Sequence, residues 1–172
     1  MLRFLLPPSK PRRLPWLLAI SAATVALDRI TKIWVSAHVP YGGSIPVIDH
    51  VLRISHWTND GAAFSLFASS ASPQTVRWLL VAFASLAALV VLLLLIRLGN
   101  RIGIVTVALA LILGGAIGNV HDRIAYGSVV DFIEVHIVHY HYPDFNVADS
   151  CVVIGACLLL IESLLPQKKS AE

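Results

Sequence analysis

The chain has 172 residues, of which 57% are hydrophobic and only 13% are charged. That length suits a single domain, and so apolar a composition excludes an ordinary soluble globular protein. The formal net charge of +3 is small, and it does not indicate a basic patch for a nucleic-acid partner. The composition therefore predicts an integral membrane protein.

Four apolar segments predict four transmembrane helices, because about 20 apolar residues cross the ~30 Å hydrocarbon core of a bilayer. The first begins at Leu14, after a short basic and proline-rich stretch. It continues past Ala23, which favours a retained span over a cleaved signal peptide. The predicted spans are 14–35, 76–97, 102–121 and 147–165, within one domain, 1–172, that has outer loops at 36–75 and 122–146.

The basic residues are distributed unevenly between the two sides of the membrane. Eight lie on the side of the termini: Arg3, Lys10, Arg12, Arg13, Arg97, Arg101, Lys168 and Lys169. Three lie on the other side, namely Arg53, Arg77 and Arg123, and two lie within the first span. Because Lys and Arg are enriched on the cytoplasmic side, we predict cytoplasmic termini and an outer position for the loops.

The first outer loop carries the signals of a strand and a turn. Val47 to Trp57 is rich in β-branched residues, and its imperfect alternation favours a strand. The following Asn59-Asp60-Gly61 is a turn signal, most often of a simple hairpin. The aromatic residues Trp57, Phe64 and Phe67 predict that this loop rests against the bilayer surface.

Acidic residues lie at the ends of the predicted spans, where a charged group near hydrocarbon is a functional-site hypothesis. Asp28 and Lys32 are four residues apart on one helix face and can pair. This pair is either a neutralised pair near the membrane exit or part of a site. Asp122-Arg123 is more often a structural pair at the interface than a catalytic one.

Asp131 and Asp149 are candidates for a catalytic pair. Two carboxylates close together cannot both ionise cheaply, so one pKa rises and the pair holds both an acid and a base. Such a pair can activate water against a peptide carbonyl and protonate the leaving amine. Alternatively, Asp149 at a helix start is simply an N-cap, a position that favours Asp.

Small residues and histidines form two further patterns. Gly114, Gly115 and Gly118 lie on or near one helical stripe, which favours close packing against a neighbouring helix. The histidines at 136, 139 and 141 lack a motif such as His-Glu-x-x-His, so they are interpreted as surface residues and no metal is expected. Cys151 and Cys157 lie within the last span without metal-ligand spacing.

Five motifs occur in one order along the chain: Asp28-x-x-x-Lys32, Asn59-x-Gly-Ala-Ala-Phe64, Gly114-Gly-Ala-x-Gly-Asn-x-x-Asp-Arg123, Val129-Val-Asp-Phe132 and Phe145-Asn-x-Ala-Asp149. In these motifs the chain resembles the lipoprotein signal peptidase (signal peptidase II) family. The resemblance implies an α-helical integral membrane protein with four transmembrane helices and a small β-rich outer, periplasmic subdomain. It also implies an aspartyl protease of the bacterial inner membrane.

The resemblance implies a substrate and a set of site residues. Prolipoproteins would be cleaved before a diacylglyceryl-modified cysteine, in contact with membrane lipids. We further expect that the protein is a monomer and needs no cofactor. Asp131 and Asp149 would be catalytic. The supporting residues would be Asn59, Gly61, Asn119, Asp122, Arg123, Asn146, Asp28 and Lys32.

Two other classes of protein are alternatives. A small proton- or ion-coupled carrier would also hold acids in the membrane, although carriers usually place their site near the midplane. A non-catalytic assembly protein would use the same acids as caps at interfaces.

The charge distribution predicts which positions face the outside. Single cysteines at Ser70 and Tyr142, in a background without Cys151 and Cys157, should react with an impermeant thiol reagent added to intact spheroplasts. Reaction only after the cytoplasmic face is opened would contradict the predicted orientation.

Overall fold

The computed structural model describes residues 13–61, 72–138 and 140–165. Positions 64, 67, 70 and 139, which figure in the sequence analysis, lie outside this part of the chain. The described residues form four helices and a four-stranded sheet. The helices are α1 (Leu14–His38), α3 (Pro73–Leu98), α4 (Ile104–Ala125) and α5 (Val147–Leu164), and the strands are β1 (Ser44–Ile48), β2 (Leu52–Asn59), β3 (Val129–Ile137) and β4 (Tyr140–Phe145).

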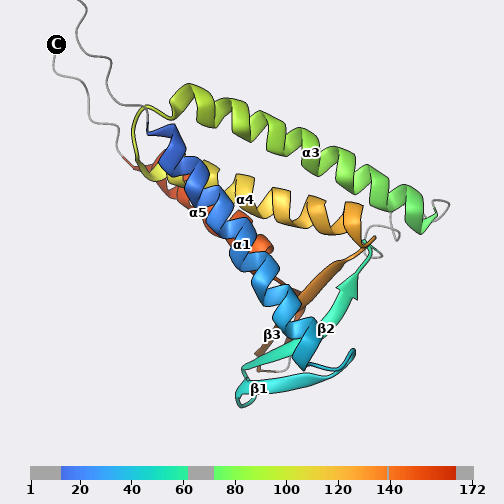
Figure 1. Cartoon of the computed structure of the whole chain (residues 1–172). Helices are drawn as coiled ribbons and strands as arrows, with labels where there is room; N and C mark the ends of the chain where they lie inside the picture. Colours follow the sequence, from blue (N-terminus) through green and yellow to red (C-terminus); the bar gives the residue numbers. More distant parts are fainter. Residues whose placement is uncertain (1–12, 62–71, 139, 166–172) are drawn as a thin grey trace, which may run out of the picture.

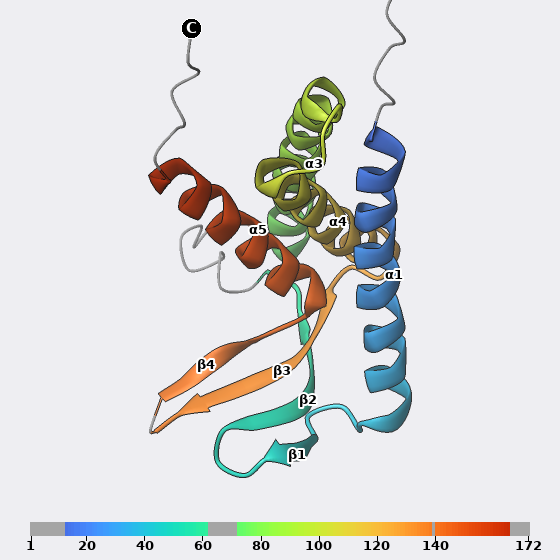
Figure 2. The ribbon, with the colours of Figure 1, turned by 90° about the vertical axis from the view of Figure 1, so that its left-hand side faces the viewer.

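All four of these helices are long and apolar enough to cross a membrane, as predicted. The start of α1 and the end of α5 lie at one end of the helix bundle, and the sheet lies beyond the other end (Figures 1 and 2). The observed helices end within four residues of the predicted spans. The largest difference is at α4, which continues to Ala125, so Asp122 and Arg123 lie in its last turn rather than in a loop.

The sheet is antiparallel with strand order β1-β2-β3-β4. The strand predicted from Val47 to Trp57 is confirmed, but a turn after Ile48 divides this region into β1 and β2. Asn59 ends β2, whose neighbours are β1 and β3. Among the described residues, Asn59-Asp60-Gly61 therefore does not join a hairpin.

The strands β3 and β4 replace what the sequence analysis treated as a single outer loop. The sequence of β3, Val-Val-Asp-Phe-Ile-Glu-Val-His-Ile, is rich in β-branched residues, which is the signal of a strand. Asn59 of β2 lies opposite Val129, and Trp57 lies opposite Asp131. This pairing brings the end of β2 next to Asp131.

Helix α4 lies at the centre of the bundle and contacts α1, α3 and α5. A Cβ atom on Gly114 would lie 2.6 Å from Thr24 Cβ of α1, and one on Gly115 would lie 2.4 Å from the Ala148 carbonyl oxygen of α5. The predicted small-residue packing face is therefore confirmed. Close backbone approach of this kind is how helices associate in a membrane, where burial of apolar surface contributes little.

The outward faces of the helices are apolar and exposed. On α3, for example, Phe83 is 75% exposed and Leu79 is 62% exposed. Such faces suit contact with lipid chains. The polar side chains that are buried in the bundle are therefore the informative ones.

The tight contact at Gly115 predicts a test of helix packing. Gly115→Ser should lower the free energy of unfolding in detergent by about 1–3 kcal/mol, because its Cβ would meet Ala148 and Val152 of α5. The matched control is Gly103→Ser. At this N-cap position the backbone is extended, no atom lies within 4 Å of an added Cβ, and Ser is a favoured residue. Equal thermal unfolding midpoints for the two variants would contradict the packing role.

Candidate active site

A buried lysine links two aspartates at the junction of α1 and α4. Lys32 and Asp28 are each 1% exposed, and Lys32 Nζ donates to Asp28 Oδ2 at 2.7 Å. The same nitrogen donates to Asp122 Oδ2 at 2.7 Å and to Asn119 Oδ1 at 3.2 Å. The predicted Asp28–Lys32 pair is therefore confirmed. The expected pairing of Asp122 with Arg123 is wrong, because the carboxylate of Asp122 instead contacts Lys32 and Arg29.

Arg29 completes the charge balance of this cluster. Its Nη1 lies 3.3 Å from Asp122 Oδ1, and its other terminal nitrogen donates to the Tyr126 hydroxyl. Two carboxylates thus face two cations. Buried charges are tolerated only when they are paired with good geometry and hydrogen-bonded, and this arrangement meets both conditions.

The second oxygen of Asp28 positions the start of α5. Asp28 Oδ1 accepts a hydrogen bond from the Ala148 backbone N–H at 2.9 Å. Asn146 is the N-cap of α5, and its Oδ1 accepts from the Asp149 backbone N–H at 3.0 Å. Asp149 Oδ2 in return accepts from the Asn146 backbone N–H at 3.3 Å. The alternative that Asp149 is the N-cap is therefore wrong, since it lies at the third helical position in a capping box.

Amide side chains hold both candidate catalytic acids. Asp131 Oδ1 accepts from Asn146 Nδ2 at 2.7 Å, and its Oδ2 accepts from Asn59 Nδ2 at 3.0 Å. Asp149 Oδ1 accepts from Asn119 Nδ2 at 2.7 Å. Asn146 therefore contacts both acids, and it is itself fully buried at 0% exposure.

Gly61 fixes the orientation of Asn59. Its backbone N–H donates to Asn59 Oδ1 at 2.9 Å, which turns the Nδ2 group of Asn59 towards Asp131. The φ angle of Gly61 is +90°, and a Cβ atom there would lie 2.6 Å from Leu80 Cδ1. Only glycine suits both the backbone conformation and the space.

Arg123 lies near the acids without a direct ion pair among the described residues. Its Nη1 donates to the Asn119 carbonyl oxygen at 3.4 Å. Its charge interacts with the carboxylates of Asp149, Asp131 and Asp122. Its buried Nε has no hydrogen-bond partner among the residues that the structure describes. The ten predicted site residues thus belong to one continuous network of hydrogen bonds.

Burial changes the protonation of Asp131. The side chain is 4% exposed, and loss of solvation raises its pKa from 3.8 to about 6, with the neighbouring Asp149 carboxylate contributing in the same direction. Hydrogen bonds from Asn59 and Asn146 oppose this rise because they stabilise the carboxylate. Asp131 is thus an acid that holds its proton in weakly acidic solution.

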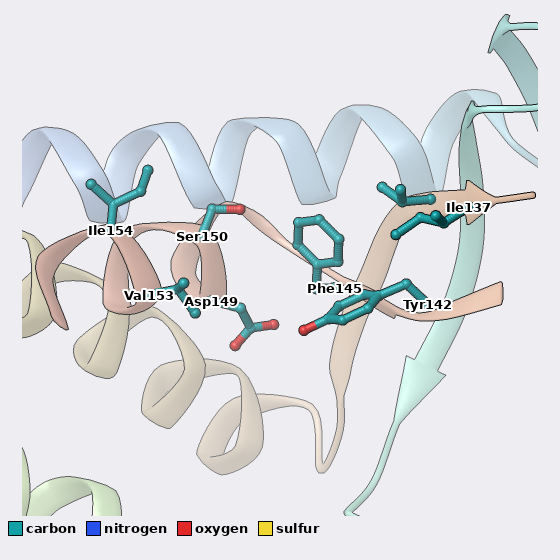
Figure 3. Close-up of a pocket in the computed structure, with 8 residues that line it drawn as sticks. Ile137, Tyr142, Phe145, Asp149, Ser150, Val153 and Ile154 are labelled. Atoms are coloured by element: carbon teal, nitrogen blue, oxygen red, sulfur yellow. The ribbon is translucent and has the colours of Figure 1, made fainter. Parts of the chain in front are cut away.

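An apolar groove of about 390 Å³ opens beside Asp149. It is lined by Val135, Ile137, Tyr142, Phe145, Asp149, Ser150, Val153 and Ile154. Figure 3 shows the Tyr142 hydroxyl pointing towards the Asp149 carboxylate, with the apolar side chains around them. Asp149 is the one acid among these lining residues. The sequence analysis missed this groove because it did not identify β3 and β4, which supply half of the lining.

The fold and the site define a class: a multi-pass membrane protein with two aspartates bridged by asparagines where the bundle meets the sheet. Comparisons with known proteins narrow this class to a family. The family model described as signal peptidase (SPase) II matches residues 20–165. This chain belongs to the signal peptidase II family.

Individual relatives agree with the family match. A lipoprotein signal peptidase of Acinetobacter baumannii is 38% identical over 92% of this chain and 88% of that protein. One of Paraburkholderia phytofirmans is 43% identical over 87% and 84%, respectively. A solved bacterial membrane enzyme superposes with a TM-score of 0.72 at 29% identity and covers 95% of this chain and 100% of that one.

The raised pKa of Asp131 predicts a pH dependence of stability. Between pH 3.8 and about 6 the folded protein binds more protons at Asp131 than the unfolded chain does. The free energy of unfolding should therefore fall as pH rises through this window, by about 3 kcal/mol at most. Asp131→Asn should lack this component, so its thermal unfolding midpoint in detergent should rise relative to that of the wild type between pH 4 and pH 7.

The matched control for this measurement is Asp49→Asn, which changes an exposed aspartate in the turn between β1 and β2. Its midpoint should follow the wild type at every pH. If the unfolding midpoint of Asp131→Asn also changed with pH as that of the wild type does, the raised pKa of Asp131 would be contradicted.

Proposed function

We propose that Asp131 and Asp149 are the catalytic pair with which this signal peptidase II removes the signal peptide from prolipoproteins. The bond cleaved is the one before the diacylglyceryl-modified cysteine. The observation that carries the assignment is Asn146, which donates its side-chain amide to Asp131 and exchanges two hydrogen bonds with Asp149. One residue thereby holds both acids beside each other, as acid–base catalysis requires.

We propose that Asp131 carries the shared proton at the start of the reaction and that Asp149 is ionised. Burial raises the pKa of Asp131, whereas Asp149 lies in the first turn of α5, where the helix dipole favours negative charge. Different surroundings for two neighbouring carboxylates are how such sites separate an acid from a base.

The reaction then proceeds in two steps, formation and breakdown of a tetrahedral diol, each with two proton transfers. Asp149 takes a proton from a water molecule as its oxygen attacks the carbonyl carbon before the modified cysteine. Asp131 gives its proton to the carbonyl oxygen, which forms a tetrahedral diol. Asp149 then protonates the amine nitrogen, the carbon–nitrogen bond breaks, and a diol hydroxyl returns its proton to Asp131.

The remaining network residues position these groups. Asn59, Asn119 and Asn146 direct the carboxylates, and the cluster of Asp28, Lys32 and Asp122 fixes the helices that carry them. We assign Arg123 to substrate binding. Its Nε–H has no acceptor within the described part of the chain, so it is available to a backbone carbonyl of the substrate.

The apolar groove beside Asp149 suits a lipid-modified substrate. Its walls are almost entirely aliphatic and aromatic, and it borders exposed apolar faces of α5 such as Val153 and Ile154. A substrate can therefore reach Asp149 from within the bilayer with its acyl chains still in lipid. We also propose that one copy of the chain is sufficient, because every residue of the network comes from a single chain.

We propose an orientation in the bacterial inner membrane with cytoplasmic termini and a periplasmic site. Arg97 lies in the last turn of α3, and Arg101 lies in the connection from α3 to α4, at the bundle end away from the sheet (Figure 1). The positive-inside bias favours the cytoplasm for that end. A carrier function has no comparable support, since the acids gather at the sheet end of the helices and the family is one of proteases.

Conservative variants test the catalytic assignment. Asp131→Asn and Asp149→Asn should each lower single-turnover cleavage of a lipidated prolipoprotein by about 10⁴-fold, because Asn keeps the shape of Asp but cannot take up and release a proton at neutral pH. Asp122→Asn should mainly lower the thermal unfolding midpoint. Asp49→Asn controls for an exposed aspartate and should cleave at the wild-type rate.

A rate above about one tenth of wild type for either pair variant would remove that aspartate from the mechanism. The unfolding midpoint in detergent, measured on the same preparations, distinguishes a lost proton carrier from a lost fold.

A further inference from the structure

We propose that the β3–β4 hairpin carries a zinc-type metal site, separate from the catalytic pair, on the face opposite the apolar groove. Its core is Glu134, His136 and His141, whose ligand atoms all lie within 4.8 Å of one another. This proposal departs from the sequence-based interpretation of isolated surface histidines. It does not depend on the catalytic assignment.

Strand geometry explains why these three side chains converge. Glu134 and His136 are two residues apart on β3 and therefore lie on the same face of the sheet. His136 lies directly opposite His141 of β4. The two imidazole rings stack with centroids 4.8 Å apart and planes 11° from parallel, and both Nε2 atoms lie near Glu134 Oε1.

A bulge in β4 brings a fourth possible ligand, Asp144, to the edge of this cluster, outside the three residues whose ligand atoms converge. The register shifts between the Val135–Tyr142 pair and the Ile133–Phe145 pair, so three residues of β4 match two of β3. This extra residue places Asp144 on the same face as His141. Asp144 Oδ1 lies 3.2 Å from His141 Nε2, and its Oδ2 accepts a hydrogen bond from the hydroxyl of the buried Ser55.

The distances suit a small ion after slight adjustment. Glu134 Oε1 lies 2.6 Å from His136 Nε2 and 3.7 Å from His141 Nε2. Zinc binds such atoms at about 2.0–2.2 Å, so the donors of a tetrahedral site lie about 3.3 Å apart. Since no two of the three ligand atoms are more than 4.8 Å apart, binding of an ion between them requires that their separations change by at most about 1.5 Å.

The donor types select the class of metal. Two neutral imidazoles and two carboxylates balance a divalent charge, and imidazole nitrogen favours Zn²⁺ and similar transition metals. Calcium and magnesium prefer sites built from oxygen ligands alone. Arg53 lies 3.8 Å from the other oxygen of Glu134, Oε2, which leaves Oε1 to the histidines.

Such an ion would bind on the face of β3 and β4 that is opposite the groove. Val135 and Tyr142 lie on the same two strands as the ligands and line the groove on the opposite face. The bond between β3 and β4 through the metal would stiffen this wall. His136 is five residues from Asp131 along β3, about 16 Å, so the ion would take no part in the proton transfers.

Metal titration of the full-length protein in detergent, purified without a histidine tag, tests this site. Isothermal titration with Zn²⁺, and with Co²⁺ as a spectroscopic substitute, should show one equivalent bound. The combined substitution His136→Gln and His141→Gln should weaken this binding at least about 100-fold, because half of the donors are removed. The control, His38→Gln with His50→Asn, removes two exposed histidines from other elements and should bind as the wild type does.

Several outcomes would overturn the proposal. They are no binding by the wild type at about 100 μM metal, one-equivalent binding that survives in the double variant, or an equal loss in the control. If the double variant does not fold, Glu134→Gln, which keeps the size of the side chain, takes its place with the same expected loss. Prolipoprotein cleavage by zinc-free protein should stay within about twofold of that by the zinc-loaded form; a larger loss would contradict a site separate from catalysis.

Discussion

The buried ammonium group of Lys32 is the contact on which the rest of the site depends. It lies between carboxylates of α1 and α4, at 2.7 Å from each, and the second oxygen of Asp28 binds the first turn of α5. Lys32 thus connects α1 and α4 directly and α5 through Asp28. Loss of one partner from such a buried pair typically costs about 3–5 kcal/mol, because it leaves an uncompensated charge. The same lysine also orients Asn119, which in turn holds Asp149.

Asparagine suits the bridging positions because its side chain is both donor and acceptor. At Asn146 the acceptor oxygen caps α5 while the donor nitrogen binds Asp131. A carboxylate in that position would repel both acids, and an aliphatic side chain would leave them unsatisfied. The two acids therefore stand in unlike surroundings, one at a helix start and one on a strand, although a single side chain connects them.

The parts of this structure that could be predicted from the sequence are those set by local spacing. The four spans follow from runs of apolar residues, the Asp28–Lys32 pair from its i,i+4 separation, and the packing of α4 from its glycine stripe. The strands β3 and β4 were missed because β3 pairs with β2, which joins Asn59 to Val129 across the intervening helices α3 and α4, and a local pattern carries no information on that partner.

Two predictions within the site were wrong because each rested on a residue's immediate sequence context. Sequence neighbours suggested that Asp122 pairs with Arg123, but on a helix adjacent residues point in different directions, and Asp122 contacts α1 instead. Asp149 was a candidate N-cap because Asp is favoured there. The structure has Asn146 in that role, and the capping-box spacing of Asn146 and Asp149 was the signal that could have distinguished them.

The hydrogen bond from Ala148 to Asp28 has a consequence for biogenesis. It joins the last helix of the chain to the first, so the arrangement of the acids is complete only when α5 has entered the membrane. During synthesis, a ribosome-bound chain that has inserted only three helices lacks both Asp149 and the partner of Asp28 Oδ1. Under the proposed assignment of Asp149 to catalysis, proteolytic activity therefore requires that α5 has inserted and that its first turn has docked on Asp28.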